Sequence, residues 1–402
     1  MSSARSDVQL HCMMADSQQL RDCLNKVAKE QKYVNPEITI EEISSGGANY
    51  TSKLFTAVVS EAGKEDLHLF AKVAVFSESM RVNLPNLFLV EQYMYTELVK
   101  WYETIERESG VPEEDRLIFC KFYGLDATLY KEIMVLENLL PQGYGPHDRF
   151  HSIDWPYAAA AVRDLAKMHA LSFAFAKKHP EEFEKALKNI TLDWPAEIMD
   201  TIIRQPFSTA VKVVNPEHKE AFVKFMDEAL KTPYFDILKP VNSKVAIIHR
   251  DYRGNNLLHR RRDDGTVDIK IVDLQTLQGG SPVTDLIYFI FTGSDEKFRA
   301  QYFDKLLDHY YTELSAAMKR LQLNPDEVFS RADFDYEMKE KLPFGLTLAV
   351  FTLPVITVEM ENAPQVDESL DISKFNVEKT SDLYAERLNG VVNDYVKWGI
   401  LK

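Results

Sequence analysis

Cysteines, long apolar runs and excess positive charge are all scarce in this sequence. Only Cys12, Cys23 and Cys120 occur among 402 residues. Their odd number argues against a disulfide framework, and their spacing matches no zinc-binding pattern. The first 24 residues contain no continuous apolar core, so no signal peptide is expected. These features favour a reducing compartment, and we expect a cytoplasmic protein.

The chain is acidic: it contains 62 Asp and Glu but only 47 Lys and Arg, which gives a net charge of −15. Phosphate backbones attract basic surfaces, so we expect no nucleic-acid partner. The most apolar stretch, about 342–358, is interrupted by Pro343, Gly345 and Pro354. We therefore expect a buried helix there rather than a membrane span. No obligate protein partner is evident.

The distribution of patterns along the chain predicts two lobes. Period-two alternation predicts strands, and apolar residues at helical spacing predict helices. In the first part, strands are expected at 38–40, 54–59, 67–76 and 130–136, with helices at 16–31 and from about 85. In the second part, helices are expected at 155–178, 216–231, 296–320 and 380–397, with short strands at 244–248, 256–259 and 267–272. The sequence therefore predicts an α+β protein with a small β-rich N-lobe, residues 1–140, and a large mainly helical C-lobe, residues 141–402.

The clearest motif runs from His249 to Leu258 and continues through an apolar strand to Asp273. Asp251 and Asn256 lie on a loop before a short strand. Asp264-Gly265 predicts a hairpin turn, so the returning strand brings Asp273 back to the same end of the ribbon. Two carboxylates and one amide are thereby expected at one place.

Phosphoryl transfer uses such a group of side chains. A carboxylate orients the attacking hydroxyl and accepts its proton, while a carboxylate and an amide oxygen hold Mg²⁺ against the phosphates. The spacing H-x-D-x-x-x-x-N followed by a strand and Asp is the kinase signature. We predict Asp251, Asn256 and Asp273 as catalytic residues, with Asn256 and Asp273 as metal ligands. The alternative is that Asp251 and Asp273 are surface acids beside a hairpin.

Lys72 and Glu91 form a second candidate pair. Leu69, Ala71 and Val73 share one face of the third strand by alternation, so Lys72 projects to the other. A lysine there is suited to binding the α- and β-phosphates of ATP, with a helix glutamate fixing its position. An isolated strand lysine is usually solvated, and this remains the alternative.

Two further segments are predicted to contact the nucleotide. A glycine-containing turn between the first two strands would let backbone amides approach the phosphates, although such a pair is commonly just a turn. The segment joining the lobes would touch adenine through its backbone. The residues assigned to nucleotide binding in these segments are Gly46, Gly47, Ala48, Asn49, Glu137 and Leu139.

Several conspicuous residues are interpreted as structural. We expect His249 to support the catalytic loop and His169 to be a hydrogen-bonded core histidine. The run Arg260-Arg261-Arg262 is expected at a solvated hairpin tip. Asp285 either braces the catalytic loop from the start of a helix or is a plain N-terminal helix acid.

The sequence resembles the ecdysteroid kinase-like family, within the aminoglycoside- and choline-kinase branch of the protein-kinase-like fold. The resemblance covers about residues 20–395. It rests on the segments Ser45 to Tyr50, Phe70 to Val73, Leu136 to Tyr144, His249 to Leu258, Ile271 to Gln275 and Gly280 to Leu286.

That resemblance implies a two-lobed kinase fold, with ATP and Mg²⁺ as cofactors and a hydroxylated, ecdysteroid-like small molecule as acceptor. It implies Asp251 as base, Asn256 and Asp273 as Mg²⁺ ligands and Lys72 as the phosphate lysine. Two departures affect the expected acceptor. Arg250 stands where the family usually has Gly, and Tyr252-Arg253-Gly254 replaces a more usual Leu-Trp-Val run.

A protein kinase is disfavoured, because Asp273-Leu274-Gln275 is not D-F-G and no A-P-E follows. Aromatic residues of the C-lobe are expected either to line an apolar acceptor wall or to belong to the core: Tyr288, Phe289, Phe291, Phe344 and Phe351. The alternative function is a pseudokinase-type module that binds a nucleotide or a lipophilic ligand without phosphoryl transfer.

Overall fold

The computed structural model describes residues 18–43, 52–76, 80, 84–362, 377 and 380–402. These residues divide into two compact units, and each is presented here by itself. Unit 1 contains the described residues of 18–80 and 120–143. Unit 2 contains those of 84–119, 144–364 and 373–402.

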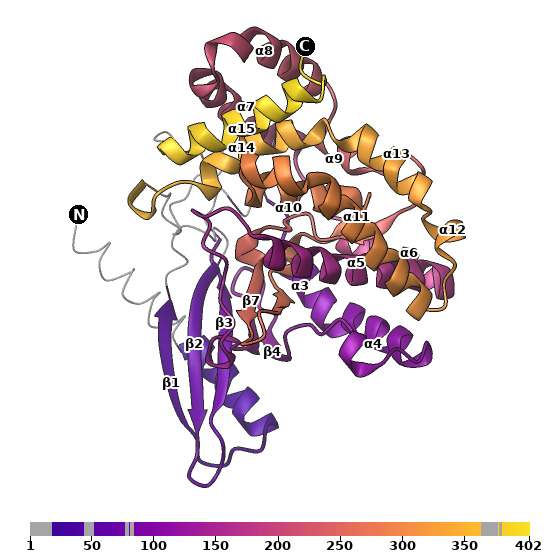
Figure 1. The fold of residues 1–402 in the computed structure, drawn as a ribbon. Helices are drawn as coiled ribbons and strands as arrows, with labels where there is room; N and C mark the ends of the chain where they lie inside the picture. Colours follow the sequence, from indigo (N-terminus) through magenta and orange to yellow (C-terminus); the bar gives the residue numbers. More distant parts are fainter. Residues whose placement is uncertain (1–17, 44–51, 77–79, 81–83, 363–376, 378–379) are drawn as a thin grey trace, which may run out of the picture. The chain divides into compact units, whose positions relative to one another are not determined.

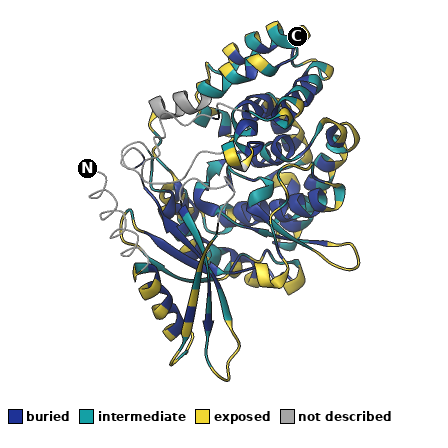
Figure 2. Ribbon diagram, turned by 90° about the vertical axis from the view of Figure 1, so that its left-hand side faces the viewer, coloured by how far each residue is buried: buried dark blue, intermediate teal, exposed yellow. Residues whose placement is uncertain are grey.

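Unit 1 is a five-stranded antiparallel sheet with one helix on it (Figure 1). Helix 18–30 packs its apolar face on the sheet, where Leu24, Val27 and Leu69 are almost completely buried. Its other residues are exposed, as the alternating colours of the helix show (Figure 2). The strands follow the order β1 (Glu37–Ile43), β2 (Ser52–Ser60), β3 (Leu67–Ala74), β5 (Ile133–Glu137) and β4 (Phe122–Asp126).

Unit 2 is mainly helical. Its longest helices, α5 (Trp155–Lys178) and α11 (Glu296–Arg320), pack along each other. Asp154 caps α5 by accepting a hydrogen bond from Tyr157 N at 3.0 Å, and Pro156 occupies the first turn, where its missing N–H costs nothing. The other helices are α3 (Leu87–Tyr93), α4 (Val99–Glu108), α6 (Pro180–Ile190), α7 (Ala196–Val213), α8 (Lys219–Ala229), α9 (Tyr234–Leu238), α10 (Val283–Gly293), α12 (Pro325–Val328), α13 (Arg331–Lys341), α14 (Phe344–Ile356) and α15 (Asp382–Lys397).

The apolar stretch near the C-terminus forms α14. This helix contains Pro354 and is buried over most of its length. The prediction of a buried helix is therefore confirmed. Across the part of the chain that the structure describes, no helix combines the length and apolar character needed to cross a bilayer.

Two short antiparallel ribbons lie within unit 2. β7 (Leu257–Arg261) pairs with β8 (Val267–Ile271), and β6 (Ala246–Ile248) pairs with β9 (Gln278–Gly280). The strand β9 was not predicted. Gly280 lies opposite Ala246, and a Cβ added to it would lie 2.5 Å from Ile248 Cδ1 and 3.0 Å from the Leu238 backbone oxygen, so a larger residue here would require its neighbours to shift. The predicted α+β organisation, a β-rich part and a mainly helical part, is confirmed.

Candidate active site

The catalytic motif is built around the β7–β8 hairpin. Asp264 and Gly265 (φ +82°) form the predicted turn, in which Thr266 N donates to Asp264 Oδ1 at 2.9 Å. At the open end, Leu257 pairs with Ile271 and Val272 N donates to Asn256 O at 3.0 Å. The hairpin therefore places the residue before β7 beside the residue that precedes Asp273.

Asn256 lies directly against Asp251. Its Nδ2 donates to the Asp251 backbone oxygen at 2.9 Å and to the Asp251 Oδ2 at 2.8 Å. Asp273 follows β8 in the left-handed region at φ +62°, a conformation that non-glycine residues rarely adopt outside functional sites. The loop and the returning strand thus carry two carboxylates and an amide toward one end of the ribbon.

Arg253 links these groups electrostatically. Its Nε donates to both oxygens of Asp251, at 2.9 and 3.2 Å. Burial disfavours the charge of Arg253, but the neighbouring Asp251, Tyr288 and Asp273 outweigh that effect and raise its pKa above the ordinary value. The guanidinium is therefore a fixed positive charge among the predicted catalytic side chains. The sequence did not predict this role, although Arg253 departs from the family pattern.

Tyr288 on α10 also contacts the loop. Burial, the charge of Asp251 and a hydrogen bond with the Asp251 side chain raise the pKa of Tyr288 well above 10. Its phenol is therefore neutral and positions the carboxylate. The sequence left Tyr288 either on an acceptor wall or in the core and gave no indication of this contact.

Asp285 braces the catalytic loop from the first turn of α10, as one of the two interpretations of the sequence predicted. Its Oδ2 accepts from His249 N at 2.6 Å and its Oδ1 from Arg250 N at 2.7 Å. His169, fully buried, contacts Asp285 Oδ2 at 3.2 Å and the Tyr310 hydroxyl at 2.7 Å. The prediction of a hydrogen-bonded core histidine is confirmed.

His249 supports the loop, also as predicted. Its Nε2 lies 3.1 Å from Val272 O, and its Nδ1 accepts from Asp251 N at 3.3 Å. Both ring nitrogens are therefore used to connect the loop to the strand that leads to Asp273.

The backbone of Arg250 is in the left-handed region, at φ +68°. A side chain costs roughly 1–2 kcal/mol there, which explains why glycine suits this position. Three hydrogen bonds hold the conformation: the backbone N–H groups of His249 and Arg250 donate to Asp285, and Thr276 Oγ1 donates to His249 O at 2.8 Å.

Glu91 and Lys72 belong to different units, and the structure describes each within its own unit. Glu91 is fully buried in α3, and its Oε1 accepts from Leu274 N at 3.2 Å, next to Asp273. Lys72 lies in β3 opposite Leu54 of β2 and Met134 of β5, and it is 5% exposed. It is therefore not a solvated strand lysine.

The predicted adenine segment ends β5. Glu137 is held by Gln142 Nε2 at 2.6 Å and by Lys121 N at 3.3 Å. Leu139 is buried, and its backbone N–H donates to no other residue in the described ranges. Gly46, Gly47, Ala48 and Asn49 lie outside the described residues.

The donor set fits a magnesium ion that is completed by phosphate oxygens. Both side-chain hydrogen bonds of Asn256 use Nδ2, which leaves the amide oxygen as the atom suited to a cation. Asp273 supplies a carboxylate nearby. Within the ranges that the structure describes, no group of three His, Cys, Asp or Glu side chains could hold a metal ion.

The aromatic residues of the C-lobe were expected either on an acceptor wall or in the core. Phe289 packs against Tyr252, and Phe291 packs against Tyr395 and Trp398, and both phenylalanines are buried in the core. Phe344 is buried as well, so these three agree with the core interpretation. The acceptor wall stays a prediction for Tyr288 and Phe351, which are half-buried.

The arginine run lies at the hairpin, as expected. Arg260 and Arg262 pair with Asp268 at 2.9 and 2.8 Å, and Arg261 pairs with Asp154 at 2.7 Å. These partly exposed ion pairs give each arginine an acidic partner within the protein.

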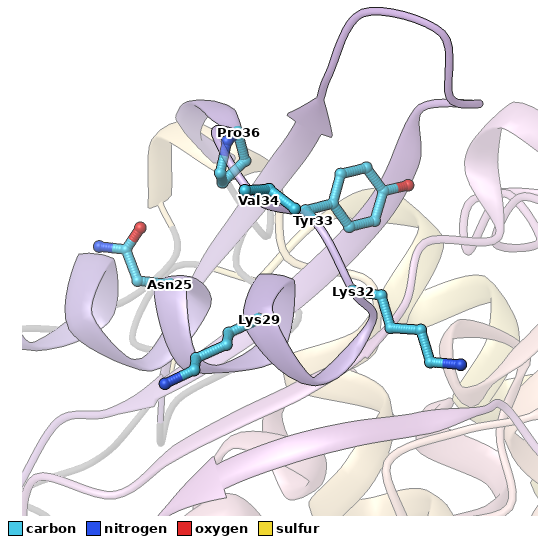
Figure 3. Close-up of a pocket in the computed structure, with 6 residues that line it drawn as sticks. All are labelled: Asn25, Lys29, Lys32, Tyr33, Val34 and Pro36. Carbon is cyan, nitrogen blue, oxygen red and sulfur yellow. The ribbon is translucent and has the colours of Figure 1, made fainter.

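A hollow of about 500 Å³ lies in unit 1, at the end of helix 18–30 (Figure 3). Its walls include none of the predicted site residues. The side chains of Lys29 and Lys32 extend away from one another there. The lining residues are Asn25, Lys29, Lys32, Tyr33, Val34 and Pro36.

Comparison with known proteins identifies the class. The model of the ecdysteroid kinase-like family matches residues 46–323, which is more than half of the chain. The chain therefore belongs to the ecdysteroid kinase-like family. This membership confirms the predicted family and, together with the sheet and helix organisation, the protein-kinase-like fold class. No curated protein gives a significant match.

Solved structures similar to this chain are aminoglycoside phosphotransferases. The GDP and kanamycin complex of APH(2")-IIia is 10% identical with a TM-score of 0.44, covering 82% of this chain and 90% of that chain. APH(3'')-Id from Streptomyces rimosus, in complex with ADP and streptomycin, is 11% identical with a TM-score of 0.31, covering 76% and 92%. An aminoglycoside-3'-phosphotransferase of type VIII is 15% identical with a TM-score of 0.36, covering 82% and 98%. At these values the likeness supports no inference about substrate.

Proposed function

We propose that this protein is an ATP-dependent phosphotransferase that acts on a hydroxyl of a small, lipophilic, ecdysteroid-like acceptor. The observation that carries the proposal is the contact of Asn256 with Asp251 at 2.8 Å at the end of the hairpin that delivers Asp273. Family membership supports the same class of reaction. We place the protein in the cytoplasm on the basis of its few cysteines.

Asp251 acts as the base in this proposal. Arg253 and Asn256 fix its carboxylate, so one oxygen can be aimed at the acceptor hydroxyl. The hydroxyl oxygen forms a bond to the γ-phosphorus, its proton passes to Asp251, and the bond to the bridging oxygen breaks to release ADP. The positive charge of Arg253 is close to the phosphate charge that Asp251 would otherwise repel.

The nucleotide would be held mainly by residues of the N-lobe, 1–140. Lys72 binds the α- and β-phosphates, and Glu91 positions it. The turn of Gly46, Gly47, Ala48 and Asn49 covers the phosphates, while Glu137 and Leu139 meet adenine through their backbones. Asn256 and Asp273, in the C-lobe of residues 141–402, would hold Mg²⁺, which neutralises phosphate charge when bound.

Labelled product formation tests the proposal. The protein is incubated with [γ-³²P]ATP, Mg²⁺ and a fraction of hydroxylated lipophilic metabolites, and labelled products are identified by mass spectrometry. We expect a phosphate ester with the wild type and none with Asp251→Ala or Asp273→Ala. Ester formation by Asp251→Ala at a near-normal rate would refute the assigned base.

A second candidate function is a pseudokinase-type binding module. The observation in its favour is that Arg253 already engages both oxygens of Asp251 and Asn256 engages one of them. An acceptor hydroxyl would then have to share the Asp251 carboxylate with Arg253 and Asn256. Calorimetry that shows Mg²⁺–ATP binding, with no ATP consumed across a panel of hydroxylated steroids and xenobiotics, would support this candidate.

A further inference from the structure

Arg250, the residue immediately before Asp251, stacks against three aromatic rings. Its guanidinium carbon lies 4.8 Å from the ring centre of Phe235, 5.0 Å from that of Trp194 and 5.6 Å from that of Tyr234. Two of these rings open α9, and the third precedes α7. We call these four residues the Arg250 cluster.

The positive charge of this cluster has no acidic partner within the described ranges. Arg253 pairs with Asp251, Arg299 with Asp394, and Arg260 with Asp268. Arg250 forms no ion pair with a described carboxylate, and only its backbone N–H meets Asp285. The net charge of the chain is −15, so carboxylates are abundant. Arg250 lies beside the catalytic loop and yet pairs with none of the described carboxylates, which leaves its charge available to a negatively charged ligand.

The chain also holds Arg250 in a backbone conformation that favours glycine. Its φ is +68°, and the hydrogen bond to Asp285 Oδ1 at 2.7 Å maintains it. A strained residue that the surroundings hold in place is a common feature of functional sites. The chain therefore keeps a cation beside Asp251, at a position where glycine would avoid the backbone strain.

The three rings lie 4.8 to 5.6 Å from the guanidinium carbon and contain no anionic group. The N–H donors of a guanidinium lie in its plane and match the two oxygens of a carboxylate or sulfate. Arg250, Trp194, Tyr234 and Phe235 are all half-buried, so part of the cluster reaches solvent. The edge of the guanidinium is thus suited to an anionic group on a ligand.

The surroundings of the cluster are apolar. Tyr234 packs against Phe344 at 5.9 Å and Phe351 at 5.8 Å between ring centres, on α14. Phe344 is buried and Phe351 is half-buried, so Phe351 and Tyr234 are the rings of this group that a ring-containing ligand could reach. Charge and apolar surface therefore occur together beside the proposed base.

We propose that the Arg250 cluster binds a carboxylate or sulfate group of the acceptor, so that the preferred substrate is an apolar hydroxylated molecule that also carries one anionic group. This inference rests on the proposed function, because it takes Asp251 as the base that receives the acceptor hydroxyl. It names a class of acceptor, and it makes Arg250 a specificity-determining residue.

Calorimetry with matched ligands tests this proposal separately from turnover. The probes are two hydroxylated acids, cholic acid and 4-(hydroxymethyl)benzoic acid, each compared with its methyl ester. We expect the wild type to bind at least one acid about tenfold more tightly than its ester, as a charge-assisted hydrogen bond provides. Arg250→Gln and Arg250→Gly should both lose that preference, and Arg250→Gly does so without backbone strain.

The controls separate the possible roles of Arg250. Arg261→Gln, which alters an exposed hairpin arginine, should keep the preference for the acid. Equal binding of acid and ester by the wild type, binding of neither acid, or an unchanged preference in Arg250→Gln would each overturn the proposal. A loss of ATP affinity in Arg250→Gln equal to its loss of acid affinity would also overturn it, since Arg250 would then serve the nucleotide. Absence of ATP turnover with intact acid preference would reject only the proposed function.

Discussion

Arg253 donates through Nε to both carboxylate oxygens of Asp251, at 2.9 and 3.2 Å. The two side chains are 14% and 20% exposed, so water screens the pair only partly. The pair fixes the orientation of the proposed base and places a cation near the transferring phosphate. Its contribution is therefore expected in the transition state more than in nucleotide binding.

Arg253→Gln should lower kcat by about tenfold to a hundredfold, in the range for loss of one preorganised charge contact. The KM for ATP should change little, because the nucleotide is assigned to other residues. Steady-state kinetics on acceptor and ATP separate the two parameters. Arg253→Lys should restore part of kcat, while Arg261→Gln should behave as the wild type. Equal loss of kcat and of ATP affinity in Arg253→Gln would contradict this role.

Asp285→Asn should destabilise the fold. Both carboxylate oxygens of Asp285 accept a backbone N–H, and the residue is only 1% exposed. In the asparagine variant one of these oxygens becomes an NH₂ group, so a backbone donor would meet another donor. An unsatisfied buried donor costs about 1–3 kcal/mol. Urea denaturation measures the loss. Asp295→Asn provides a matched control, because Asp295 caps α11 and Asn caps equally well. Equal stability of the two variants would show that Asp285 does not brace the loop.

The left-handed conformation of Arg250 predicts an unusual order of stability among its variants. Alanine and glycine both remove the aromatic contacts of the side chain, so their difference reports the backbone alone. Arg250→Gly should be more stable than Arg250→Ala by about 1–2 kcal/mol. Denaturation at one pH gives this difference. A more stable alanine variant would mean that φ at position 250 is negative in solution.

Glu106 predicts a pH dependence of stability. Burial, partly opposed by a hydrogen bond from Leu117 N at 2.9 Å, raises its pKa from 4.5 to about 7. The folded state therefore holds more protons than the unfolded state between these values, and the contribution of this group to stability falls as pH rises from about 4.5 through 7.

Glu106→Gln removes this titration and retains an oxygen that can accept from Leu117. Relative to the wild type, the variant should gain stability as pH rises from 5 to 7 and level off above that, as measured by thermal unfolding. Glu108→Gln, which changes an exposed residue of α4, provides the control and should follow the wild type. A constant difference between wild type and Glu106→Gln across this range would disprove the assignment.

Local patterns predicted the parts of the site that lie on one continuous segment. The H-x-D-x-x-x-x-N spacing, the Asp264-Gly265 turn and the strand before Asp273 specify a hairpin, and the structure contains it. The supporting positions of His249 and Asp285 also follow from their places in the motif. Such features depend on contacts that are close in sequence.

Features that depend on distant segments had no comparable signal. Trp194 and Tyr234 surround Arg250, but neither has a spacing relation to the catalytic motif. β9 contains two glycines, so it showed no strand pattern, and its pairing with the distant strand β6 is seen only in the structure. Likewise, nothing in the sequence indicated that Glu91 accepts from Leu274 N.

The central claim is that Asp251 performs chemistry at a site whose nucleotide is held by other residues. The most direct test measures Mg²⁺–ATP affinity by calorimetry and acceptor phosphorylation by radiolabel transfer in Asp251→Ala beside the wild type. The account predicts affinity within about threefold of wild type and turnover lowered at least about a thousandfold. Turnover close to wild type with unchanged affinity would contradict it.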